Sequence, residues 1–209
     1  MTPGYTQVPS TLRGRGITVL DVEGNGRVPP EIVEIAMLPV VGTAVSPAEL
    51  HSWLVRPRKS ITPHISRKAH GVSNEDVAGC PRWSDVGPKV GRLTFGRVLV
   101  VHNEGIERKV LAAHLIEWNP LLVLDTMRLA EAVWPGIRSY TLTSLVKYAE
   151  IDTSPLEGMH HHRAAHDAWA VWLLLCTLVR AAELDWAAIV HTAGLPEFAW
   201  PEEPEAGRW

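Results

Sequence analysis

The sequence predicts a mixed α/β domain in which an antiparallel meander comes first and helix-connected parallel strands follow. Three short apolar segments, at residues 17–22, 32–41 and 50–55, are joined by short links. Later apolar segments at residues 98–101 and 121–124 alternate with helical patterns. Short links favour antiparallel pairing and helical crossovers favour parallel pairing, so the order of the elements predicts the sheet.

The first three strands are predicted from composition. Residues 17–22 form a short apolar run rich in β-branched side chains, which is typical of a buried strand. Two prolines, Pro29 and Pro30, stiffen the link to the second strand, and Pro39 interrupts that strand. The third strand takes its apolar character from Leu50, Trp53 and Val55.

Helical spacing dominates the rest of the chain. The expected helices span residues 83–93, 104–118, 163–183 and 186–193. Shorter helical segments are expected within residues 60–71, after Asn74, after Asp125 and from Tyr140. Asp125 is a candidate N-cap because its carboxylate can accept from the first backbone amides of a helix.

Length and composition indicate one globular domain of residues 16–194. The chain has 209 residues, of which 46% are hydrophobic and 21% charged. Residues 1–15 are expected to form a flexible lead-in, and residues 195–209 a Pro-, Glu- and Trp-containing tail that could dock on a polymerase or another protein. No apolar run reaches membrane-spanning length, roughly 18 residues or more, so we expect no membrane association.

Charge and cysteine content narrow the functional class. The formal net charge of −3 excludes a global basic field of the kind that dominates non-specific duplex binding, so any nucleic-acid contact must be local. Cys80 and Cys176 lie far apart without paired spacing, which argues against a disulfide framework or a structural zinc site. A reducing cytoplasm is therefore the expected compartment.

Two carboxylates one residue apart, Asp21 and Glu23, close the first strand. Alternating side chains of a strand share a face at this spacing, so both can project into one site. Two negative charges there cost electrostatic energy unless a cation or proton offsets them, and a divalent metal is the natural candidate. An isolated Asp-x-Glu is more often a polar strand end, so the assignment depends on the rest of the chain.

Two further regions carry candidate chemistry. Glu107 follows the strand at 98–101 and lies near a helix start, where an acid also stabilises the helix dipole. His162 and Asp167 lie five residues apart at the start of the longest expected helix. An imidazole can take a proton from a metal-bound water while a nearby carboxylate holds the metal.

In order, these segments resemble the three motifs of the DEDDh, or DnaQ-like, 3′-to-5′ exonucleases. The motifs are Leu20-Asp21-Val22-Glu23, His102-Asn103 with an acid four residues after the Asn, and His162-x-x-x-x-Asp167. Spacer segments resemble the family as well, namely Ile32–Ala36, His70–Val77, and Leu124–Thr126 with Leu129–Ala130. The resemblance covers roughly residues 16 to 180.

The resemblance implies a ribonuclease H-like fold with a five-stranded mixed sheet flanked by helices, and a site for two Mg²⁺ or Mn²⁺ ions. It implies that Asp21 bridges both metals, that Glu23 and Asp167 complete the tighter site, and that Glu107 serves the second. His162 would be the general base. The implied reaction releases nucleoside 5′-monophosphates from single-stranded 3′ ends, DNA more than RNA.

Two departures from the family pattern stand out. The second motif of the family ends in Asp, whereas Glu107 is one methylene longer, with Glu104 nearby as a substitute. Many members carry Thr-Thr-Gly and a bulky apolar residue that wedges the terminal base, where this chain has residues 24–28, Gly-Asn-Gly-Arg-Val. The residues expected to contact substrate are Gly24, Asn25, Gly26, His102 and Asn103.

Two alternatives remain open at this point. One is an exoribonuclease or oligonucleotide-trimming enzyme of the same fold. The other is a catalytically impaired nucleic-acid-binding or polymerase-associated module, which the longer Glu107 and the aromatic tail would suit.

Overall fold

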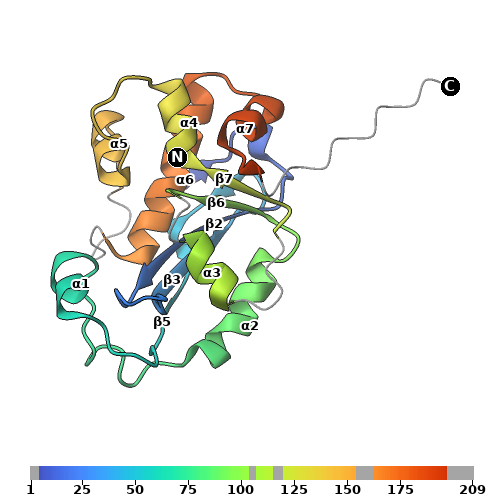
Figure 1. Cartoon of the computed structure of the whole chain (residues 1–209). Coiled ribbons are helices and arrows are strands. Elements are labelled where there is room, and N and C mark those ends of the chain that lie inside the picture. The colour runs from blue at the N-terminus through green and yellow to red at the C-terminus, as the bar shows by residue number, and fades with distance from the viewer. Residues whose placement is uncertain (1–4, 104–106, 115–119, 154–161, 197–209) are drawn as a thin grey trace.

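A computed structural model describes residues 5–103, 107–114, 120–153 and 162–196 of the chain. Its centre is a five-stranded sheet in the order β5-β3-β2-β6-β7 (Figure 1). The strands are β2 (Ile17–Gly24), β3 (Ile32–Pro39), β5 (His51–Leu54), β6 (Val98–Val101) and β7 (Leu122–Asp125). Antiparallel pairs join β2, β3 and β5, and parallel pairs join β2, β6 and β7. The predicted mixed sheet, with the meander first and the crossovers later, is confirmed.

The helices follow the expected order with shorter bounds. They are α1 (Pro63–Lys68), α2 (Trp83–Thr94), α3 (Glu107–His114), α4 (Thr126–Val133), α5 (Leu142–Tyr148), α6 (Ala164–Ala181) and α7 (Trp186–Ala193), with single 3₁₀ turns at Ser10–Leu12 and Pro47–Glu49. Within the described ranges, no helix combines the length and the apolar character that crossing a membrane requires.

Two hydrophobic clusters cover the two faces of the sheet. Ile17 and Val19 pack in the cluster that contains most of α6, including Trp169. Leu20 and Val22 pack in the cluster that contains the apolar side of α2. The alternation along β2 therefore assigns odd-numbered residues to the α6 face and even-numbered residues to the α2 face.

Residues 6–12 differ from the flexible lead-in that the sequence predicts. Strand β1 (Thr6–Gln7) pairs antiparallel with the short strand β4 (Ala44–Val45). Neither strand was predicted from the sequence. Val8 and Leu12 are each only 1% exposed and belong to the cluster under α6. Burial of these two side chains contributes more free energy than ordering the segment costs. The sequence did not indicate this, because the apolar residues stand singly among Pro, Gly and Thr.

Two other expectations need correction. The segment after Asn74 is a series of turns instead of a helix, because Asp76 accepts from the backbone and hydroxyl of Ser73 and closes a local loop. The sequence predicts that the tail begins at residue 195, but Leu195 belongs to the folded domain. It is buried, and its N–H donates to Val123 O of β7. Residues 197–209 lie outside the described residues.

Removing residues 1–12 should therefore destabilise the protein. Loss of the buried Val8 and Leu12 side chains removes about 3 kcal/mol or more of burial energy, which corresponds to a fall in melting temperature of about 6 °C or more. Thermal unfolding followed by circular dichroism measures it. The full-length variant Tyr5→Ala/Gln7→Ala, at two exposed positions of the same segment, is the control and should keep the melting temperature close to that of the parent. An equal fall in the truncation and the control would contradict the packing.

Candidate active site

Asp21 and Glu23 occupy the carboxyl end of β2 and share the α6 face of the sheet, as their odd numbers require. The register between β2 and β3 becomes irregular directly after Glu23, where the chain leaves the sheet for the loop of residues 25–31. Because β6 and β7 run parallel to β2, the segments that follow them lie at the same end of the sheet. The amino-terminal end of α6 supplies Asp167 to this end.

The structure brings Asp21, Glu23 and Asp167 together. One carboxylate oxygen from each lies within 4.8 Å of the others, and all three side chains are partly buried. At an effective dielectric of about 20, two such charges repel by about 3 kcal/mol per pair. An all-oxygen set of converging carboxylates is the donor chemistry that Mg²⁺ and Mn²⁺ prefer, so these residues fit a divalent cation.

His162 and Asp167 are connected through the backbone. His162 N donates to Asp167 Oδ2 at 3.2 Å, and His166 Nδ1 donates to Asp167 Oδ1 at 2.9 Å. His162 has a positive φ of 62° and an exposed ring, immediately before the N-cap Arg163 of α6. Each carboxylate oxygen of Asp167 keeps further lone-pair capacity for a metal. The backbone of His162 is therefore held against the carboxylate cluster.

An ion pair between partly exposed Arg163 and buried Glu34 fixes the start of α6 to the sheet. Arg163 Nε and Nη2 donate to Glu34 Oε2 and Oε1 at 2.8 and 3.0 Å, and Glu34 is only 3% exposed. This side-chain bond is the main cause that raises the pKa of Arg163 above its ordinary value. Glu34 lies directly opposite Glu23 in the β2–β3 register, so the pair sets the position of α6 relative to the carboxylates.

Asn25 builds the loop of residues 25–31. Its side chain is fully buried; Oδ1 accepts from Arg27 N and Glu31 N at 3.1 and 3.0 Å, and Nδ2 donates to Lys59 O at 3.2 Å. These bonds use both ends of the amide inside the protein. The predicted role of Asn25 in substrate binding stays a prediction, and the structure gives the side chain a loop-forming role.

Gly26 and His70 complete the loop. Gly26 has a φ of +70°, and a Cβ there would lie 2.3 Å from Ile65 Cγ1, so a side chain cannot be accommodated. His70 Nδ1 accepts from Val72 N, which leaves Nε2–H to donate to Gly24 O at 3.2 Å. The loop is thereby tied to the segment around α1, while Val28 at its tip is 94% exposed.

The second motif is anchored by Asp125. Its Oδ1 accepts from Met127 N at 2.8 Å, which confirms the predicted cap of α4, and from Asn103 N at 3.0 Å. Asn103 is exposed with a φ of 62°, whereas both ring nitrogens of His102 contact protein, at Thr126 Oγ1 and Tyr140 O. Burial is the main cause that lowers the pKa of His102. Substrate contacts by this pair stay predictions.

Glu107 is the first residue of α3, but its side chain lies outside the described part of the structure, as do Glu104, His160 and His161. Its role as a metal ligand therefore stays a prediction. The other four predicted catalytic residues gather at one end of the sheet, with three carboxylates in contact range and His162 tied to one of them.

Sheet order, helix placement and the acidic cluster together define a ribonuclease H-like protein with a candidate metal centre at the carboxyl end of its first long strand. The chain belongs to the exonuclease family of DEDDh, or DnaQ-like, type: the family profile RNase_T, described as Exonuclease, matches residues 18–175. The resemblance seen in the motifs is thus confirmed.

Curated relatives include exodeoxyribonuclease 10 of Escherichia coli (strain K12), which is 34% identical over 152 residues, covering 72% of this chain and 63% of that enzyme. A DNA polymerase III subunit epsilon-like protein of Rhodobacter capsulatus is 33% identical over 150 residues, covering 68% of this chain and 21% of that protein. The chain thus matches less than two thirds of the length of each of these relatives.

Among solved structures, exonuclease X in complex with 5′ overhanging duplex DNA superimposes with a TM-score of 0.70 at 29% identity, covering 84% of this chain and 98% of that one. The nuclease domain of 3′hExo, a DEDDh family member bound to rAMP, superimposes with a TM-score of 0.61 at 13% identity, covering 79% of this chain and 92% of that one. The second likeness shows the shared fold alone.

Sequence reasoning missed the Glu34–Arg163 pair and the contact of His166 with Asp167. Glu34 lies in an apolar strand, Ile-Val-Glu-Ile-Ala. An acid in such a strand needs a cationic partner, so its presence there could have indicated an ion pair. The partner lies 129 positions away, beyond the reach of local patterns. His70 and His114 also form hydrogen bonds inside the protein.

Replacing Glu34 by Ala should destabilise the protein by about 2 kcal/mol or more, because Arg163 and Ala164 N lose their buried acceptor. Chemical denaturation measures the change. Glu131→Ala, at an exposed site on α4, is the matched control and should stay within about 0.5 kcal/mol of the parent. Equal stabilities for both variants would show that the ion pair does not anchor α6.

Stability should also fall in mild acid because of His70. Burial is the main cause that lowers its pKa below 6.5 in the folded protein. The unfolded chain therefore takes up the proton first, so the contribution of neutral His70 is complete above about pH 6.5 and is lost as the pH falls through the folded pKa. His70→Gln should flatten the dependence of melting temperature on pH between 7.5 and 5, whereas exposed His191→Gln should not; identical slopes would refute the assignment.

Proposed function

We propose that this chain is a metal-dependent 3′-to-5′ exonuclease that acts on DNA and releases nucleoside 5′-monophosphates. The convergence of Asp21, Glu23 and Asp167 within 4.8 Å is the observation that carries the proposal. Exonuclease family membership supports it, as do curated relatives named exodeoxyribonuclease and DNA polymerase III subunit. We propose DNA as the substrate, and not RNA, because these relatives are named for DNA.

Asp21, Glu23 and Asp167 would hold the divalent cations, with Asp21 shared between two ions and Glu107 completing the second. Bound Mg²⁺ or Mn²⁺ would activate the attacking water and stabilise the leaving 3′ oxygen. Carboxylates bind a metal ion in their ionised form, so the affinity for metal would depend on their ionised state. The Glu34–Arg163 pair keeps Asp167 in position for this role.

His162 is proposed as the general base. His162 is exposed and its backbone N–H donates to Asp167, so its imidazole would be placed to accept a proton from an attacking water held at the carboxylates. The positive φ of 62° favours His, Asn or Asp among residues with side chains. The imidazole of His162 is thus attached to a turn that the bond from its N–H to Asp167 stabilises.

The loop of residues 25–31 is proposed to meet the terminal nucleotide. Its interior bonds leave Val28 almost fully exposed at the tip, next to the strand that ends in Glu23. An apolar side chain on a rigid loop can stack against a terminal base and separate it from its pair. Val28 would therefore supply the apolar wedge at a position where the sequence departs from the family pattern.

Asp21→Asn should reduce nucleotide release by about 100-fold or more, because it removes a charged oxygen ligand, and His162→Ala by about 10²–10⁴-fold. Release from 3′-labelled single-stranded DNA and RNA, with Mg²⁺, Mn²⁺ or EDTA, measures both. His191→Ala, an exposed histidine on α7, is the control and should match the parent. Metal-independent digestion, or full activity in Asp21→Asn, would sink the proposal; faster RNA digestion would favour the exoribonuclease alternative.

Val28→Ala should slow digestion of duplex 3′ ends more than digestion of single strands, since only paired ends need separation. The ratio of the two rates, compared with that of the parent, measures this. Val41→Ala, which removes a similar exposed side chain elsewhere, should leave the ratio unchanged. A uniform loss on both substrates would mean that Val28 does not act as a wedge.

Polymerase association through the tail remains a proposal supported by the relatives named as polymerase III subunits, since residues 197–209 lie outside the described residues. Cytoplasmic location stays a prediction as well.

A further inference from the structure

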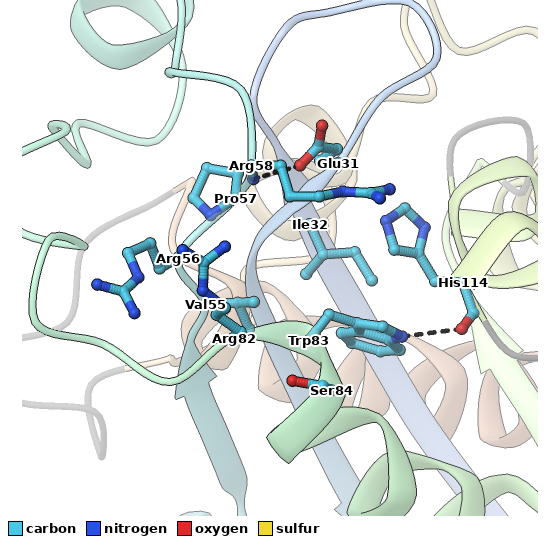
Figure 2. Close-up of a pocket in the computed structure, with 10 residues that line it drawn as sticks. All are labelled: Glu31, Ile32, Val55, Arg56, Pro57, Arg58, Arg82, Trp83, Ser84 and His114. Carbon is cyan, nitrogen blue, oxygen red and sulfur yellow. Dashed lines mark hydrogen bonds between the residues drawn. The ribbon is translucent and has the colours of Figure 1, made fainter.

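A second concave site lies on the α2 face of the sheet. It is a cavity of about 330 Å³, at the lower end of the roughly 300–1,000 Å³ range of small-molecule pockets. Figure 2 shows its main walls: Ile32 at the start of β3, Val55 directly after β5, Arg58 from the following segment, Arg82 and Trp83 at the N-cap and start of α2, and His114 at the end of α3. We call it the arginine pocket.

The floor of the arginine pocket is apolar and rigid. Ile32 and Val55 are each 1% exposed and belong to the cluster under α2. Trp83 Nε1–H donates to His114 O at 2.8 Å, and the two rings meet edge to face with centroids 5.4 Å apart. The indole is thus fixed before any ligand arrives, which lowers the entropic cost of stacking a flat group against it.

The rim of the arginine pocket is cationic. Arg56, Arg58 and Arg82 line it, against the single carboxylate of Glu31. That carboxylate is already engaged, since Glu31 Oε2 accepts from Arg58 N at 2.5 Å and Lys59 N at 3.4 Å. In Figure 2 the Arg58 side chain extends over Ile32 toward His114. An excess of guanidinium groups in a chain of net charge −3 favours an anionic ligand with phosphate oxygens.

The arginine pocket and the carboxylate cluster lie at the same end of the sheet on opposite faces. Ile32 begins β3 and Leu54 ends β5, and both strand ends are level with the carboxyl end of β2. The loop of residues 25–31 connects Glu23 to the pocket wall at Glu31. A polynucleotide that meets the cluster at its 3′ end and passes the exposed loop tip can therefore reach this pocket.

We infer that the arginine pocket binds a nucleotide of the engaged nucleic acid other than the one being cleaved, with a base against Trp83 and a phosphate paired with Arg58 or Arg82. The inference rests on the proposed function, because the ligand is the same polynucleotide. An acidic peptide would satisfy the arginines but would leave the apolar floor and the indole unmatched. Proteins that bind single-stranded nucleic acids combine a flat surface for stacking bases with positive charge for the phosphates.

Fluorescence anisotropy of a labelled 20-nucleotide single strand in EDTA tests the inference without turnover. The double variant Arg58→Ala/Arg82→Ala should bind about 10-fold more weakly, and its salt dependence should fall by roughly 1.4 in the slope of log K against log salt, for two lost phosphate contacts. The double variant Lys89→Ala/Arg92→Ala, at two exposed positions of α2, is the charge-matched control and should keep the affinity of the parent. An unchanged affinity in the double variant, or an equal loss in the control, would overturn the inference.

A small substrate separates this inference from the proposed function. The p-nitrophenyl ester of thymidine 5′-monophosphate needs only the carboxylate cluster, so the parent and the double variant should hydrolyse it equally with Mn²⁺. No hydrolysis by the parent would count against the proposed function, whereas a normal rate together with unchanged DNA affinity in the double variant would count against the pocket alone. A glutamate-rich peptide that binds the parent through Arg58 and Arg82, while DNA affinity is the same in both proteins, would also overturn the inference.

Discussion

Three carboxylates held within 4.8 Å of one another are the constraint on which the rest of the structure depends. Their mutual repulsion, about 3 kcal/mol per pair, is a cost that a bound cation or a proton would reduce. The fold imposes the arrangement in spite of this, through the alternation of β2 and the packing of α6 on the same face. An energetic cost of this kind at a protein surface is characteristic of a functional site.

The surrounding polar contacts hold this arrangement in place. Glu34 and Arg163 fasten the start of α6 to β3, and Asp125 links the turn of the second motif to α4. Asn25 closes the loop that follows Glu23. Each of these side chains is bonded inside the protein, so the three carboxylates are held in place without a ligand. Such preorganisation lowers the cost of reaching the productive geometry.

Sequence patterns predicted the sheet, the long helices and the carboxylates, because strand alternation and helical periodicity are local properties. Contacts between distant segments were not predictable in this way. Arg163 pairs with Glu34, and Leu12 packs into the core from a segment that looked flexible. The structure gives Asn25 and Gly26 loop-forming roles that depend on Lys59 and Ile65, whereas their predicted contact with substrate stays a prediction. The role of such a residue depends on its burial and on partners far away in the sequence, and a short motif contains neither kind of information.

The central claim is that the carboxylate cluster is a cation site whose repulsion the metal relieves. Melting temperatures of the parent and Asp21→Asn, each in EDTA and in saturating Mn²⁺, test it most directly. In Mn²⁺ at about 100 times its dissociation constant for the parent, the parent should gain about 2.7 kcal/mol of stability relative to EDTA. The variant, which lacks one carboxylate ligand, should gain less. An equal response of both proteins to Mn²⁺, or no response of the parent, would contradict the account.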